Sequence, residues 1–209
     1  ANEASRISAI YEMNDEDDNL AAPCIETPFR AAVGNAIERG LQWIRDTEAN
    51  TGHINEAQGR HNFLAVLALL GKPTCPGQPG PGVGYAGLEP SDQALVTRLI
   101  RYLIDQEESM TNANQTPYVY VAGGNLSALS QYITTGGPEE IGAPVTVSQA
   151  IANGVVALQN NQGNIAPNNQ GGWNYGTPNA SGDLSTTHFA GLGLSAAGRV
   201  IEGAARGLP

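Results

Sequence analysis

Three segments with the same spacing of apolar residues recur along the chain, and this recurrence constrains the fold more than any other feature. Their sequences are AIERGLQWIRDTE at 36–48, LVTRLIRYLIDQE at 95–107 and AIANGVVALQNNQ at 150–162. In each segment the apolar residues return every three to four positions, which is the spacing of one face of an α-helix. The pattern therefore predicts three amphipathic helices, each with one face to bury.

Each amphipathic segment is followed by a second segment that is apolar on nearly every side. The sequence NFLAVLAL at 62–69 matches HFAGLGLS at 188–195, and YVYVAGGNLSALSQYI at 118–133 lies between them. The valines and tyrosines that begin 118–133 also suit a β-strand, which is the alternative for this segment. Helices that are apolar all round are buried, so we expect an all-α fold of about three hairpins, with amphipathic helices outside and apolar helices inside.

Glycine, proline and capping residues set the expected bounds of the elements. Residues 1–27 form an acidic segment ahead of a helical repeat domain at 28–209. The helices of that domain are expected at 27–48, 56–70, 91–108, 118–133, 146–163 and 183–206.

A loop with glycines on one side of a tryptophan precedes the last helix. Gly171 and Gly172 allow a tight turn beneath Trp173, whose flat ring can cover the ends of neighbouring helices. Asp183 stands where an N-cap side chain accepts a hydrogen bond from a backbone N–H two or three residues later. The small residues that follow allow the last helix to approach another helix closely.

The stretch GGWNYGTPNASGDLSTTHFAGLGLSAA resembles the repeat of the terpene cyclase and protein prenyltransferase superfamily, whose fold is the α/α toroid. The resemblance covers most of residues 30–205. A stretched pattern that resembles the Gln…Gly-x-Trp motif of this repeat is formed by Gln162, Gly172 and Trp173. The outer helix of the repeat resembles AIERGLQWI, which contains Trp43. The resemblance implies toroid-like repeat order. It also implies that Gln162 and Trp173 brace the repeat and take no part in chemistry.

The catalytic signatures of that superfamily do not occur in their usual context. The run from Asp15 to Asp18 has the letters of the cyclase acid motif, but it leads into proline and cysteine. A solvated carboxyl group there cannot protonate an alkene, because that step requires a desolvated acid. No Asp-x-Cys pair is present to hold the zinc of the prenyltransferases. We therefore expect no catalytic residues and no cofactor.

Calcium is the alternative for the acidic segment. Leu20 stands where a calcium loop requires glycine and Pro23 lies inside the loop, so a solvated acidic segment is the simpler interpretation. The residues at the first, third, fifth and twelfth positions of such a loop are Asp15, Asp17, Asn19 and Glu26.

Two histidines, His61 and His188, occupy similar places at the starts of two apolar helices. A polar residue at a helix start needs no functional explanation. If these helices form an inner layer, the alternative is that both histidines face a cavity and bind a ligand there. That ligand would be a small apolar molecule or a glycan.

The charge and hydropathy of the chain exclude several partners. Twenty acidic residues against ten basic ones give a formal net charge of −10. This balance argues against nucleic acid, which requires clustered Lys and Arg, and against anionic membrane surfaces. No apolar run approaches the length that spans a bilayer.

The two cysteines, Cys24 and Cys75, lie in proline-flanked loops where two thiols can approach each other. We predict that they form a disulfide, which suits an exported protein; two free thiols in a cytosolic protein are the alternative. The first residue is Ala rather than Met, which also favours a processed, secreted or cell-surface protein.

In the toroid that the resemblance implies, three hairpins make only part of a closed ring, so the two ends of the array would expose apolar surface. We therefore expect an exported, non-catalytic binding or assembly module that forms a homo-oligomer or joins a larger assembly. The alternative is an enzyme of the terpenoid-cyclase or carbohydrate-active α/α-barrel type, with its substrate in a central cavity. A buried carboxylate in an apolar cavity would favour the enzyme.

Overall fold

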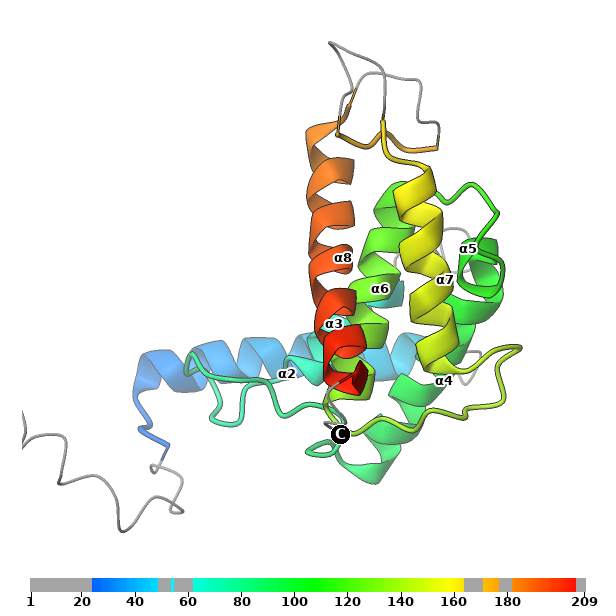
Figure 1. Ribbon diagram of the computed structural model, residues 1–209. Coiled ribbons are helices and arrows are strands. Elements are labelled where there is room, and N and C mark those ends of the chain that lie inside the picture. Colours follow the sequence, from blue (N-terminus) through cyan, green and yellow to red (C-terminus); the bar gives the residue numbers. More distant parts are fainter. Residues whose placement is uncertain (1–23, 49–53, 55–61, 164–170, 177–181, 206–209) are drawn as a thin grey trace, which may run out of the picture.

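The chain is helical throughout the part that the structure describes. This computed structural model describes residues 24–48, 54, 62–163, 171–176 and 182–205. These residues form seven α-helices and no β-strand, which confirms the all-α fold class. The helices are α2 (Pro28–Glu48), α3 (Asn62–Leu70), α4 (Pro90–Gln106), α5 (Glu108–Thr111), α6 (Val119–Thr134), α7 (Val147–Asn160) and α8 (Leu184–Ala205) (Figure 1).

The segment for which a β-strand was the alternative is the helix α6. Its two glycines, Gly123 and Gly124, are buried where α6 meets other helices. Packing on both sides therefore outweighs the β propensity of the YVYV run. The short helix α5 was not expected, and the first part of the expected helix at 56–70 lies outside the described residues.

The helices α3, α6 and α8 lie side by side in one layer, with α6 in the middle. The most extensive packing in the molecule is between α6 and α8. Behind this layer α4 packs on α3, and α7 packs on α5 and α6. Figure 1 shows α6 and α8 running in the same direction and α7 running in the opposite direction. The second helices of the predicted pairs thus share a layer, whereas toroid-like repeat order stays a prediction.

The hydrophobic core lies between the two layers. Burying one large aliphatic or aromatic side chain contributes roughly 1.5–3 kcal/mol, so the burial of these side chains is a large favourable term in folding. The largest fully buried side chains are those of Phe63, Leu69, Leu70, Leu99, Ile100, Leu103, Ile104, Met110, Leu126, Leu129, Tyr132 and Ile151.

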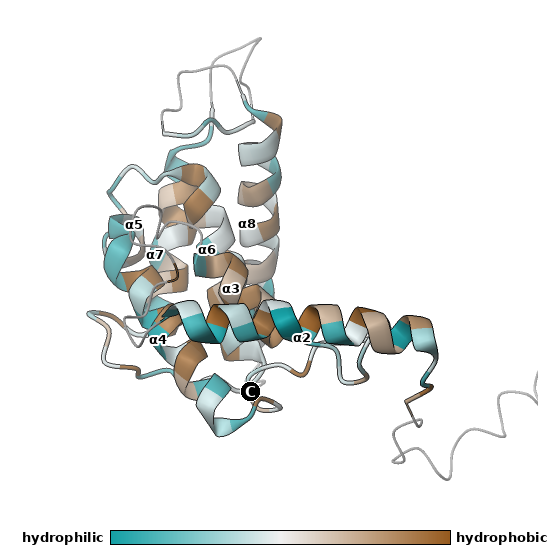
Figure 2. Cartoon of the chain, turned by 180° about the vertical axis from the view of Figure 1, so that it is seen from behind, coloured by the Kyte–Doolittle hydropathy of each residue, from teal (hydrophilic) through white to brown (hydrophobic). Residues whose placement is uncertain are grey.

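The first described helix, α2, lies across the others, and only its C-terminal half packs against them (Figure 1). Leu41 and Ile44 are buried there. The same apolar side of the helix continues toward its start as Phe29, Val33 and Ile37, which we call the α2 stripe. Phe29 is 76% exposed and Ile37 is 36% exposed. Figure 2 shows hydrophobic and hydrophilic residues alternating along α2, which extends past the other helices.

Two ion pairs hold the buried half of α2 on α4. The Arg45 guanidinium donates from Nε and Nη2 to the two carboxylate oxygens of Asp92, both at 2.8 Å. The Arg98 guanidinium donates in the same way to Glu48, at 2.9 and 2.8 Å. Asp92 is 4% exposed and Glu48 is 2% exposed. Each of these buried carboxylates is thus neutralised by a bidentate arginine. Hydrogen bonding to Asp92 raises the pKa of Arg45.

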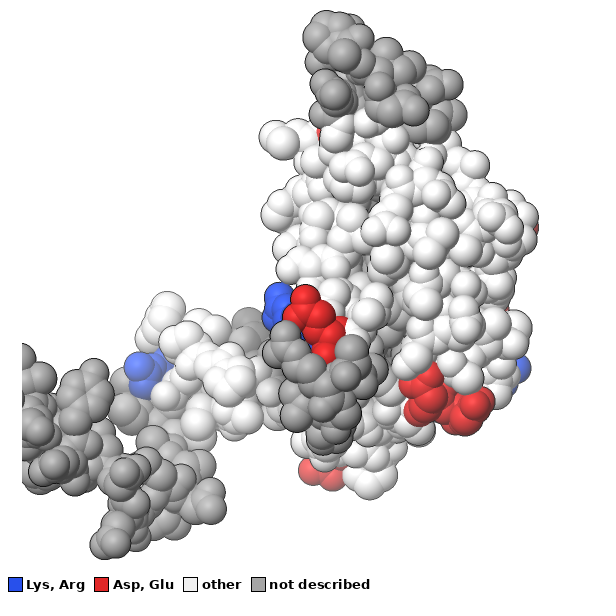
Figure 3. Space-filling view, viewed as in Figure 1, with Lys and Arg blue, Asp and Glu red and all other residues white. Residues whose placement is uncertain are grey.

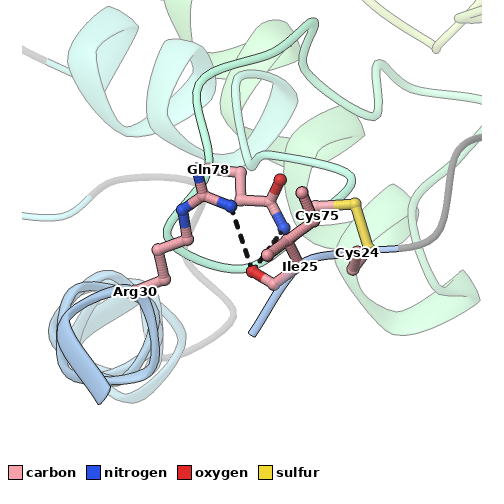
Figure 4. Close-up of a disulfide and its surroundings, with 5 residues drawn as sticks. All are labelled: Cys24, Ile25, Arg30, Cys75 and Gln78. Atoms are coloured by element: carbon pink, nitrogen blue, oxygen red, sulfur yellow. Dashed lines mark hydrogen bonds between the residues drawn. A yellow bond between two sulfur atoms is a disulfide. The ribbon is translucent and has the colours of Figure 1, made fainter. Parts of the chain in front are cut away.

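A disulfide joins Cys24 to Cys75, as the sequence predicts. Figure 4 shows that the backbone carbonyl of Ile25 accepts two hydrogen bonds beside it. The donors are Arg30 Nη1 at 3.2 Å and Gln78 Nε2 at 2.9 Å. The disulfide and these hydrogen bonds therefore tie the start of α2 to the loop that follows α3.

Charged side chains are unevenly distributed over the surface. Figure 3 shows few over α7 and the upper part of α8, a basic and an acidic group side by side over the lower end of α8, and further acidic side chains along the lower edge of that view. Within the described part of the chain, no helix has both the length and the hydropathy needed to cross a membrane.

Candidate functional site

A groove of about 370 Å³ opens on the α3–α6–α8 layer, and we call it the layer groove. The middle helix, α6, provides its floor, and α3 and α8 provide its walls. The lining residues are Leu67 of α3, then Gly124, Ser127, Ser130, Gln131 and Thr134 of α6, and Phe189, Leu192, Ala196 and Arg199 of α8.

Glycines set the depth of this groove by bringing the helix backbones together. A Cβ atom on Gly193 would overlap the carbonyl oxygen of Gly123, and a Cβ on Gly123 would overlap that of Phe189. A Cβ on Gly124 would lie 2.5 Å from the ring of Phe63 on α3. Only glycine permits these approaches, so the small residues of α6 and α8 fix the spacing of the layer.

One end of the groove is aromatic. The ring centroids of Phe63 and Phe189 lie 5.8 Å apart, and those of Tyr120 and Phe189 lie 4.1 Å apart. The Val119 N–H donates to the carbonyl of Tyr175 at 2.8 Å, which places the start of α6 beside the segment that leads into α8. Because α6 and α8 run in the same direction, Gly124 and Phe189 mark this apolar end.

The other end of the groove is polar. Thr134 and Arg199 each lie ten residues beyond the apolar end, about 15 Å along their helices. The hydroxyl of Thr134 donates to the Ser130 carbonyl at 2.7 Å, and that of Ser127 donates to the Gly123 carbonyl at 3.1 Å. Ser130 is buried, and its own hydroxyl has no hydrogen-bond partner among the described residues.

The chemistry of the lining suits binding better than proton transfer. Among its ten residues there is no Asp, Glu, His or Cys, so no lining side chain titrates near neutral pH. The two buried carboxylates of the α2–α4 contact, Asp92 and Glu48, do not line the groove and are held in ion pairs. The groove offers a ligand apolar contacts, hydroxyl groups, an amide and one guanidinium.

Trp173 joins the end of α7 to the start of α8. The ring is 7% exposed, and its Nε1–H donates to the Leu158 carbonyl of α7 at 2.8 Å. The Trp173 N–H donates to Thr187 Oγ1 of α8 at 3.0 Å, and the Trp173 carbonyl accepts from Thr186 Oγ1 at 2.9 Å. These contacts form a brace within the third helix pair, away from the layer groove.

The other residues of the same motif close the loop around Trp173. Gln162 Nε2 donates to the Gly171 carbonyl at 2.8 Å, and the N–H of Gly163 donates to the Gly172 carbonyl at 2.8 Å. Gly171 has a φ of 84°, which glycine adopts without strain. The positive φ and the hydrogen bonds together fix the tight turn beneath the ring.

Asp183 precedes α8 and accepts a hydrogen bond from the Thr186 backbone N–H at 2.9 Å. The Ser185 hydroxyl also donates to it, and these two donors hold the pKa of Asp183 below its usual range. An ionised carboxylate is favourable at a helix N-terminus, because it faces the positive end of the helix dipole.

Two residues singled out from the sequence, Trp43 and His188, belong neither to this brace nor to the layer groove. Trp43 is 60% exposed on α2 and does not join two helices as Trp173 does. His188 is exposed on α8, one turn from Leu192, and it does not line the layer groove. His61 lies outside the described residues.

The calcium alternative falls mainly on residues that the structure does not describe, namely Asp15, Asp17 and Asn19. Glu26 is described, is exposed, and lines a second groove between α2 and the loop after α3, together with Lys72 and Pro76. Within the described ranges, no three His, Cys, Asp or Glu side chains lie close enough to hold a metal ion.

Sequence reasoning did not single out the lining of the layer groove. A signal for it is present in α6, where Gly124, Ser127, Gln131 and Thr134 recur at helical spacing on an otherwise apolar helix. Such a stripe gives one face of a buried helix small and polar side chains. In comparisons with known proteins, no family model, no curated protein and no solved structure matches this chain.

Proposed function

We propose that this chain is a non-catalytic binding module that takes an apolar or amphipathic ligand in the layer groove. The observation that carries the proposal is that all three helices of one layer line a single groove. Its apolar side chains come from α3 and α8, α6 adds small and polar side chains, and Arg199 lies at one end. A lining without a titrating side chain supports binding over the enzyme alternative.

Export is part of the same proposal. The Cys24–Cys75 disulfide supports it, because disulfides persist in oxidising compartments and are rare in the cytosol. The bond holds the start of α2 rather than the groove, so it serves stability and leaves the ligand surface open.

Self-assembly is a second candidate function, and the α2 stripe favours it. The apolar side of α2 is buried at Leu41 and Ile44 and becomes more exposed toward the start of the helix, with Ile37 36% and Phe29 76% exposed. A helix that carries its apolar side past its own domain usually meets another chain there. A homo-oligomer formed through α2 would leave the layer groove free for a ligand.

The binding proposal is tested with Nile red, a neutral apolar dye whose fluorescence rises when it leaves water. We expect saturable binding to the full chain and its loss in Ala196→Trp, since the larger ring fills the groove. Ala36→Trp on the exposed side of α2 is the matched control and should bind as the wild type does. Undiminished binding by a folded Ala196→Trp variant would exclude the layer groove as the ligand site.

A further inference from the structure

We infer that the ligand of the layer groove is a straight-chain amphipath with a single negative charge, such as a fatty-acid carboxylate. This inference rests on the proposed binding function and names its substrate class. The apolar tail lies over the aromatic end and the charged head meets Arg199.

Arg199 is the cation of the groove, and it forms no ion pair with any of the described residues. Lys72, Arg45, Arg98 and Arg101 are all paired with carboxylates. No carboxylate among the described residues lies within ion-pair distance of Arg199. An unpaired guanidinium at the end of an apolar groove is complementary to an anion, and its fork of donors matches a carboxylate.

Ser130 provides a second, independent indication of a polar ligand atom. Its side chain is 3% exposed and lines the groove, and its hydroxyl makes no hydrogen bond to the described residues. The oxygen has almost no accessible surface, so a ligand oxygen reaches it only after the side chain rotates toward the groove, which would recover the free energy lost at an unpaired buried hydroxyl. Ser130 lies one turn before Thr134, toward the polar end that also holds Arg199.

The charge balance limits the head to one negative charge. Arg199 is the only Lys or Arg among the lining residues, and the chain as a whole carries a formal net charge of −10. A phosphate or diphosphate head would need further cations to offset its second and third charges. A carboxylate is therefore favoured over a phosphorylated lipid.

The shape of the groove limits the tail. About 15 Å separates the level of Phe189 from that of Arg199 along α8, which accommodates an extended chain of medium length. Leu67 and Leu192 stand on opposite walls, so an unbranched tail contacts apolar atoms on both sides. We assign the ligand as the free amphiphile rather than a membrane surface, because the net charge repels anionic bilayers.

The experiment measures displacement of Nile red from the full chain by decanoate and by its neutral analogue decanol. We expect decanoate to bind at least tenfold more tightly than decanol, and added NaCl to weaken only decanoate. Arg199→Gln should remove this preference and leave decanol binding unchanged. Arg39→Gln replaces an exposed arginine of α2 and should behave as the wild type.

The outcomes separate this inference from the proposed function. Equal affinities for decanoate and decanol, or an unchanged preference in Arg199→Gln, would overturn the anionic ligand while leaving the groove as a binding site. Absence of Nile red binding to the wild type would overturn the binding function itself. Binding to phosphatidylglycerol vesicles without displacement by decanoate would assign the anion to a membrane and also overturn the inference.

Discussion

Two tryptophans of the chain have contrasting environments, and substitution should separate them. Trp173 is buried and makes hydrogen bonds to both α7 and α8, whereas Trp43 is 60% exposed. Trp173→Ala should lower the free energy of unfolding by about 3–5 kcal/mol, and Trp43→Ala by about 0.5 kcal/mol or less. Urea denaturation of both variants measures the difference. Similar losses in the two variants would contradict the assignment of Trp173 as the brace.

Tyr132 should make the protein less stable in alkali. Its side chain is fully buried, and burial raises the pKa of Tyr132 to about 12, against about 10 in an unfolded chain. Below pH 10 both states hold the proton, so the full stability is present. As the pH rises from 10 to 12, the unfolded state ionises first and stability is lost.

Replacing Tyr132 with phenylalanine tests this dependence. The buried hydroxyl makes no hydrogen bond to the described residues, so Tyr132→Phe should leave the free energy of unfolding at pH 7 within about 1 kcal/mol of wild type, or raise it. The variant should also lose less stability than wild type between pH 10 and pH 11. Equal alkaline losses in the two proteins would show that other groups dominate.

The local contacts around Trp173 could be predicted from sequence, because glycine, tryptophan and a capping aspartate act on backbone groups nearby in the chain. The exposure of Trp43 could not, because it depends on the angle at which α2 crosses its neighbours. The places of Arg199 and Ser130 in the groove could not be predicted either, because the groove exists only where three helices pack together.

Between helices, the close contact of α6 and α8 should be sensitive to a single methyl group. Gly193→Ala places a Cβ against the Gly123 carbonyl, so we expect a loss of about 1–3 kcal/mol despite the better helix propensity of alanine. Gly198→Ala on the same helix has nothing within 4 Å of the new Cβ and should gain up to about 1 kcal/mol. Thermal unfolding of both variants distinguishes packing from propensity.

The Arg45–Asp92 ion pair between α2 and α4 should show strong energetic coupling between its two residues. Arg45→Met leaves the buried Asp92 carboxylate without its partner and should cost about 3 kcal/mol. The double variant Arg45→Met with Asp92→Leu removes both charges and should return to within about 1 kcal/mol of wild type. A double-mutant cycle by urea unfolding measures the coupling. If the loss of stability in the double variant equals the sum of the losses in the two single variants, the pair is not coupled and the prediction is wrong.

Periodicity predicted the helices themselves because one buried face imposes its spacing on the sequence directly. It left the strand alternative open for α6, because Gly123 and Gly124 weaken a helix in isolation and become favourable only against Phe63 and α8. The two α2–α4 ion pairs join residues about fifty positions apart, so no local sequence pattern predicts them.

For the chain as a whole, the α2 stripe predicts self-association at micromolar concentration. Phe29 and Ile37 leave apolar surface without cover from the described residues. Sedimentation velocity should detect a dimer or larger species, and Phe29→Asp combined with Ile37→Asp should return the monomer. Asn35→Asp, at an exposed position on the side of α2 opposite the stripe, is the control and should not dissociate it. A monomeric wild type would exclude assembly through α2.

The disulfide has a consequence for the order in which the protein is made. Cys75 follows Cys24 by 51 positions, and the bond encloses α2 and α3 but no residue of α4. Because synthesis proceeds from the N-terminus, both thiols leave the ribosome before α4 does. Oxidation of the nascent chain at that stage would close the first hairpin covalently before the helices that pack on it have emerged.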